Sequence, residues 1–315
     1  MRLVLGTMAP IHRPERRDVD RVTLAQQAMS AAHAERLHFL EAAAFGFGFI
    51  NAKMNPTGSG IQRLVQMHDF GKLVYLDLQK SGSTFVSQFL NETCNLPRVK
   101  EIKHGRIGRD YRKYRFYFIT IRHPVSQYSS LFRYGLDRKG ALYDRLAKQG
   151  KASLYQADTT SFNEWLRFML DFNNASLLGE GFEKIPESYN LGFLSFRYLM
   201  LSMAHPVKTA LKKPATIDLL QYAKEKSIVD YVIFNERLQE GLVNLAKNVK
   251  PEYFDQTRVN EFFSKERKIN ASTVKADTIK EIDGDVYRLI TEKERILLSF
   301  YWEPLSISRQ GSHED

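Results

Sequence analysis

Residues 79–84 combine side chains of the kinds that bind phosphate groups. Gly82 has no Cβ, so it can take a left-handed backbone conformation and let the chain approach a ligand closely. Lys80 places a cation just before this glycine. Hydroxyl donors are supplied by Ser81, Ser83 and Thr84. A helix starting after the segment would add free N–H groups and the positive end of its dipole. The segment therefore predicts a phosphate-binding loop.

The position of Lys80 before the glycine indicates that the phosphate ligand is not a nucleoside triphosphate bound by a P-loop of the usual pattern. A nucleoside-triphosphate P-loop carries its lysine after the last glycine, in the pattern GxxxxGK[ST]. Here Lys80 precedes Gly82, and the chain contains no GxxxxGK pattern. This order disfavours an ATPase or kinase of that class.

Alternating strand and helix patterns would position the loop. Residues 73–78 are a short apolar run of strand formers, and residues 85–94 are amphipathic with a helical period. A second predicted strand, residues 116–121, precedes a helix that starts near Pro124 and runs to about residue 137. This alternation predicts an α/β, P-loop-like three-layer fold with a central parallel sheet flanked by helices.

The C-terminal half continues the pattern. Four further helices are predicted at residues 161–172, 190–203, 217–226 and 236–247, and a third strand at residues 231–234. Residues 258–270 are charged and predicted to be rich in loops, and one long last helix is expected over residues 278–301.

A second candidate phosphate contact follows the second predicted strand. Arg122 stands at the end of that strand, and Ser130 lies about two helical turns beyond Pro124. The planar guanidinium fork of an arginine suits a phosphate dianion. Arg122 and Ser130 can converge on one phosphate if the ligand lies across the first half of the helix.

Taken together, the segments Lys80–Thr84 and Arg122–Ser130 resemble the 5′-phosphosulfate loop and the 3′-phosphate site of the sulfotransferase superfamily. The resemblance covers about residues 72–300 and is specific at these two motifs. Weaker similarity at residues 231–238 and 268–272 favours the carbohydrate (Golgi-type and bacterial) branch. The RKGxxGxW motif of the cytosolic small-molecule enzymes is absent.

The resemblance implies transfer of a sulfuryl group from 3′-phosphoadenosine 5′-phosphosulfate (PAPS) to a hydroxyl acceptor, a glycan in this branch. In this scheme Lys80 would stabilise the leaving phosphate, and Arg122 with Ser130 would hold the 3′-phosphate. The 5′-phosphate would be held by Ser81, Gly82, Ser83 and Thr84. Phe85 stands where relatives carry an aromatic residue that stacks on adenine, and core packing explains it equally well.

The general base is expected between the two phosphate motifs. His104 is the candidate, because the catalytic histidine of the family commonly lies there and histidine titrates near neutral pH. Some relatives use a glutamate, which makes Glu101 the reserve. No metal is required.

Two other classes of protein compete with this interpretation. One is an inactive relative that keeps the nucleotide pocket and acts as a binding or scaffold protein. The other is a nucleic-acid-binding protein, suggested by the formal net charge of +10. Basic strands interleaved with aromatic residues are not evident, so no nucleic-acid partner is predicted.

The remaining sequence sets the expected domain boundaries. Residues 1–68 read as an N-terminal helical extension without recognisable chemistry, residues 69–305 as the sulfotransferase domain and residues 306–315 as a flexible tail. The extension could be a docking arm, an upstream extension of the reading frame, or a helix that forms a homo-oligomer. The single cysteine, Cys94, excludes an internal disulfide and fits a reducing compartment. No signal peptide or membrane span is recognisable, which predicts a cytoplasmic protein.

Overall fold

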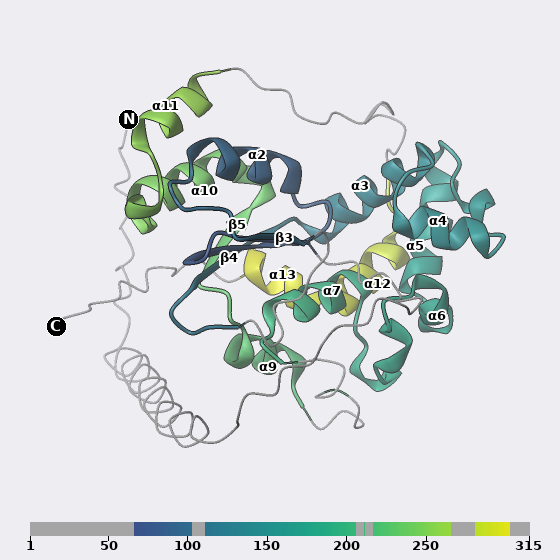
Figure 1. The fold of residues 1–315 in the computed structure, drawn as a ribbon. Coiled ribbons are helices and arrows are strands. Elements are labelled where there is room, and N and C mark those ends of the chain that lie inside the picture. Colours follow the sequence, from purple (N-terminus) through teal and green to yellow (C-terminus); the bar gives the residue numbers. More distant parts are fainter. Residues whose placement is uncertain (1–65, 103–110, 206–210, 212–216, 266–280, 303–315) are drawn as a thin grey trace, which may run out of the picture. The chain divides into compact units, whose positions relative to one another are not determined.

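The computed structural model describes residues 66–102, 111–205, 211, 217–265 and 281–302. A five-stranded sheet in the order β3-β1-β2-β4-β5 forms the centre of this part of the chain (Figure 1). Its strands are β1 (Gln66–Asp69), β2 (Leu73–Asp77), β3 (Lys100–Ile102), β4 (Phe116–Ile121) and β5 (Tyr231–Phe234). The predicted strands at residues 116–121 and 231–234 are confirmed with the same bounds.

The sheet is mostly parallel, and β1 is the exception. Strands β2, β4 and β5 pair in parallel, whereas β1 is antiparallel to both β2 and β3. A tight turn at Gly71, with φ of 75°, joins β1 to β2. The Gly71 N–H donates to the Asp69 carboxylate at 2.7 Å within this turn. The predicted parallel sheet is thus confirmed for β2, β4 and β5, whereas β1 adds antiparallel pairings. Residues 66–68, which were assigned to the extension, belong to the sheet.

Helices cover both faces of the sheet (Figure 1). One face carries α2 (Ser83–Thr93), α10 (Leu238–Asn244) and α11 (Gln256–Ser264). The other face carries α7 (Phe193–Ser202), α9 (Leu219–Lys226) and α13 (Arg295–Trp302). Successive β2 side chains enter opposite layers, because Tyr75 packs with the buried residues of α2, α10 and α11 and Leu76 packs with those of α7, α9 and α13. Every residue of α7 is buried, and most of them are apolar, as expected for a helix enclosed by the core.

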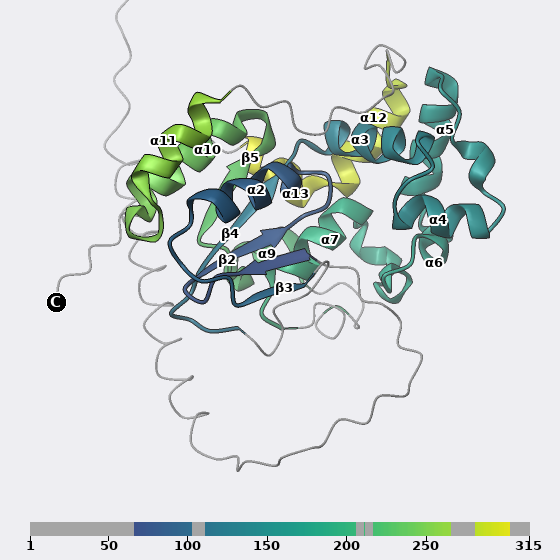
Figure 2. The same cartoon turned by 45° about the horizontal axis from the view of Figure 1, so that its top comes forward.

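A group of helices extends beyond the end of the sheet, and both views show α4, α5 and α6 together there (Figures 1 and 2). The elements of this region are α3 (Pro124–Leu136), α4 (Ala141–Lys148), α5 (Thr159–Leu170), α6 (Ala175–Leu178) and α12 (Gly284–Lys293). Single turns occur at Ala152–Leu154, Phe172–Asn174, Phe182–Lys184, Glu187–Tyr189, Asn235–Arg237 and Pro251–Tyr253, and a π-helical turn at Leu245–Val249. Among the described residues no helix is long and apolar enough to span a bilayer.

Two sequence-based expectations about the C-terminal region are wrong. Part of the segment predicted to be loop-rich, residues 258–270, forms α11, because Asp255 caps that helix and Val259 and Phe262 are buried. The long last helix is broken into α12 and α13 at Glu294. The fully buried Glu294 carboxylate accepts hydrogen bonds from the Ser195 N–H at 2.7 Å and the Tyr128 hydroxyl at 2.5 Å. It thereby caps the N-terminus of α7.

Candidate functional site

The loop between β2 and α2 is the centre of the candidate site. Lys80 and Gly82 have φ angles of 67° and 99°, in the left-handed region. A Cβ on Gly82 would lie 2.7 Å from Asn235 Nδ2 and 2.8 Å from Leu238 Cδ2. Glycine is therefore required here both by the backbone conformation and by close packing against the segment after β5. Gly82 is the N-cap of α2, so the first N–H groups of this helix lie at the loop and are not used in bonds within the helix.

The hydroxyl groups of the loop differ in their surroundings. Ser81 is fully buried, and its Oγ donates to the Leu78 carbonyl at 2.5 Å and lies 2.8 Å from Thr120 Oγ1. Its hydroxyl therefore ties the loop to β4 instead of reaching a ligand. Ser83 is half-buried, with its hydroxyl near the Asp77 carboxylate, and Thr84 is exposed on the first turn of α2.

Phe85 packs within the protein. Its ring meets Phe262 edge to face at a centroid distance of 5.4 Å and lies 6.5 Å from the Phe263 ring. Of the two roles that the sequence allowed for Phe85, adenine stacking and core packing, these contacts correspond to core packing.

The loop backbone is anchored from two sides by residues that sequence reasoning missed. Gln127 on α3 donates to the Gln79 carbonyl at 2.7 Å, and Arg197 on α7 donates to the Gln79 side chain. Arg197 also binds Glu180 at 3.0 Å, and Arg145 binds the same carboxylate at 3.1 Å. Burial would raise the pKa of Glu180, but the two arginines hold it below its ordinary value. This buried ion-pair network positions the start of the loop.

Lys80 lies in a basic environment. Its Nζ is 3.9 Å from the centroid of the Tyr134 ring, a cation–π contact. Burial lowers the pKa of Lys80, and the positive charges of Arg122 and Arg133 lower it further, whereas Asp137 opposes the shift. Within the described part of the chain, no carboxylate forms a salt bridge with this ammonium group. Lys80 is therefore a cation suited to an anionic ligand.

The structure brings the two predicted phosphate motifs together. Arg122 Nη1 lies 3.5 Å from the Lys80 carbonyl oxygen. Burial lowers the pKa of Arg122, Arg133 lowers it further, and Glu236 opposes this effect. Ser130 is half-buried on α3, one turn from Gln127 and Tyr134, the two helix residues that contact the loop. Ser130 therefore faces the same side as the loop.

A cavity of about 240 Å³ opens beside Arg122. Helix α3 and Arg122, two positions before it, supply most of its lining, and α5 and the segment before α12 supply the rest. The lining residues are Arg122, Val125, Ser126, Ser129, Arg133, Phe162, Glu281 and Ile282. Arg133 and the serines at positions 126 and 129 were not identified from the sequence. Their helical spacing after Arg122 was the signal that could have found them.

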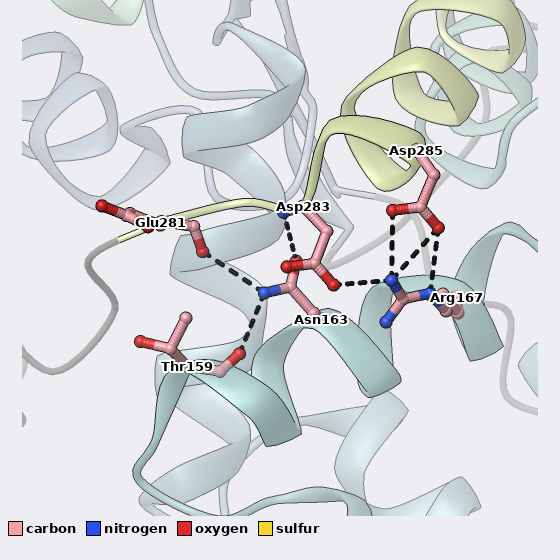
Figure 3. A network of polar contacts seen from close by, with 6 residues as sticks. All are labelled: Thr159, Asn163, Arg167, Glu281, Asp283 and Asp285. Atoms are coloured by element: carbon pink, nitrogen blue, oxygen red, sulfur yellow. Dashed lines mark hydrogen bonds and ion pairs between the residues drawn. The ribbon is translucent and has the colours of Figure 1, made fainter.

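A polar network fixes the segment that forms one wall of this cavity (Figure 3). Asn163 on α5 donates to the Glu281 carbonyl at 3.3 Å and accepts from the Asp283 N–H at 3.0 Å. Arg167 donates to Asp283 at 2.6 Å and to Asp285 at 3.1 Å. The start of α12 is thereby held against α5.

A buried acid lies beneath the loop. Asp77 ends β2 and is 3 % exposed, and among the described residues neither of its carboxylate oxygens has a hydrogen-bond partner of good geometry. Burial raises the pKa of Asp77 to about 7, although the nearby Ser83 hydroxyl offsets part of this effect. The sequence alone does not indicate this raised pKa, because the burial of Asp77 depends on the whole fold.

The side chains of the two candidate general bases, His104 and Glu101, lie outside the described part of the structure. His104 lies outside the described residues. Glu101 belongs to the edge strand β3, where its backbone pairs with His68 of β1, and its side chain is outside the described part.

The described residues contain no group of three or more histidine, cysteine, aspartate or glutamate side chains that could hold a metal ion. Comparisons with protein-family models, with curated proteins and with solved structures found no significant match for this chain.

Proposed function

We propose that this protein is a sulfotransferase that moves a sulfuryl group from PAPS to a hydroxyl acceptor, a carbohydrate, on a P-loop-like fold. The observation that carries the proposal is the meeting of two anion-binding motifs from different strand ends. Arg122 Nη1 lies 3.5 Å from the Lys80 carbonyl, beside the N-terminus of α2. A donor with phosphates at two positions needs two such motifs at once.

The geometry supports a division of roles within the donor site. The N–H groups at the start of α2, with the hydroxyls of Ser83 and Thr84, would hold the 5′-phosphate. Lys80 would stabilise the charge that develops on the leaving phosphate during in-line displacement. Arg122 and Ser130 would hold the 3′-phosphate. Ser81 would act through the loop, since its hydroxyl is bonded inside the protein.

The acceptor hydroxyl needs a base, and His104 is proposed for this role with Glu101 as the reserve. Tyr134, whose ring meets the Lys80 ammonium, would line the approach of the acceptor to the sulfuryl group.

The experiment measures binding and transfer separately. Isothermal titration with 3′-phosphoadenosine 5′-phosphate (PAP), the donor product, should show binding to the full chain. The Lys80→Ala variant should lose about 100-fold or more in transfer rate, as expected for one lost electrostatic contact to the transition state. Lys148→Ala removes the same charge from an exposed position on α4 and is the matched control.

Each outcome separates the candidate functions. A chain that does not bind PAP is not a PAPS enzyme. A chain that binds PAP but transfers no sulfuryl group to any glycan is an inactive nucleotide-binding relative. Transfer activity that survives in Lys80→Ala, Glu101→Ala and His104→Ala alike would refute the mechanism.

A further inference from the structure

A second arginine, Arg133, shares the cavity beside Arg122. Ser126, Ser129 and Arg133 follow one another at intervals of three and four residues, so they form one stripe on α3. Arg122 stands just before this helix, and all four residues line the same cavity. The stripe thus combines two guanidinium groups with two hydroxyl groups.

Arg133 has no anionic partner in the described part of the chain. Its Nε donates to the Ser129 carbonyl of its own helix at 3.4 Å, and no salt bridge engages it among these residues. Its charge lowers the pKa of both Lys80 and Arg122. Three cations are therefore close enough to repel one another, and a bound anion would offset this cost.

The opposite wall of the cavity is preformed. Phe162 and Ile282 supply apolar surface, and the Asn163 bonds to Glu281 and Asp283 fix the segment before α12 (Figure 3). The acidic side chain in the lining, Glu281, is exposed, so water screens its charge. A volume of about 240 Å³ holds a phosphate group together with several ordered waters, each of which occupies about 30 Å³.

We propose that Arg133 is a second arginine ligand of the donor's 3′-phosphate, and that with Arg122 it makes the site prefer a 3′,5′-bisphosphorylated nucleotide. This inference rests on the proposed function. The loop and α2 need no help from Arg133 to hold a 5′-phosphate, whereas two guanidinium forks can grip a terminal phosphate dianion from two sides.

The test compares two nucleotides that differ by the 3′-phosphate alone. The affinities of PAP and of adenosine 5′-monophosphate are measured by titration calorimetry, with competition for the weaker ligand. Arg133→Ala should weaken PAP about 10- to 100-fold, the loss expected for a charged hydrogen bond, and leave the monophosphate within about twofold. Arg133→Lys should lose less PAP affinity, because it keeps the charge without the planar fork.

The matched control is Arg288→Ala. It removes the same charge from an exposed position on α12 outside the cavity lining, and it should bind both nucleotides as the parent does. Thermal unfolding of each variant checks that the fold is intact. If Arg133→Ala does not fold, a selective loss of PAP affinity in Arg133→Lys supports the inference instead.

The failures are distinguishable. A parent protein that does not bind PAP defeats the proposed function and the inference with it. A parent that binds PAP, with folded Arg133 variants that bind it equally well, overturns the inference alone. An equal loss of both nucleotides in Arg133→Ala also overturns it, because a general electrostatic or structural role would have that effect.

Discussion

The buried carboxyl group of Asp77 should make the stability of this protein depend on pH. Its pKa is about 7 in the folded protein, against an ordinary value of 3.8. The folded protein therefore keeps the proton up to about pH 7, whereas the unfolded chain releases it near pH 4. A raised folded pKa contributes stability that is complete below pH 4 and is lost as the pH rises to about 7. The difference between the two pKa values corresponds to about 4 kcal/mol of unfolding free energy.

The substitution that tests this reasoning is Asp77→Asn, which keeps the shape and removes the titration. Urea unfolding of the parent and the variant at several pH values gives the difference in unfolding free energy. Relative to the parent, the variant should gain about 1.4 kcal/mol per pH unit between pH 5 and 7 and no more above that range. Asp144→Asn, on the exposed side of α4, is the matched control for loss of a carboxyl group. Parallel stability curves for the parent and Asp77→Asn from pH 5 to 8 would refute the reasoning.

Three further substitutions test how much individual buried contacts stabilise the loop and the helices around it. Gly82→Ala should destabilise the fold by about 1–3 kcal/mol in urea unfolding, because its Cβ would meet Asn235 at 2.7 Å and the backbone is left-handed; unchanged stability would mean that the loop adapts. Glu294→Ala should cost about 3 kcal/mol in thermal unfolding, since it orphans two buried N–H groups and a tyrosine hydroxyl. Arg197→Ala should cost about 3–5 kcal/mol by leaving the charge of Glu180 less well paired, and should weaken PAP binding through the loop; unaltered PAP affinity in a folded variant would exclude that coupling.

Local features of the fold could be predicted from the sequence. The strands at residues 116–121 and 231–234 and the helix from Pro124 were found because apolar period and helix-start signals act over a few neighbouring residues. The left-handed conformation of Gly82 could also be predicted, because it depends only on neighbouring residues of the loop. The pairing of the Lys80 and Arg122 motifs followed from their shared place at strand ends.

What the tertiary structure decided depends on groups far apart in the chain. Arg197 binds Gln79 across 118 positions, and Glu294 caps α7 across 99 positions. The inward direction of the Ser81 hydroxyl depends on Thr120, which comes from another strand. Strand β1 was not predicted, because its four residues include a glutamine, a histidine and an aspartate and show no apolar strand pattern. The sequence by itself determined a glycine loop between a strand and a helix and an arginine at the end of the next strand, and it predicted phosphate binding there. Packing decided which of these side chains are buried and which stay exposed, because burial and charge proximity are properties of the assembled fold.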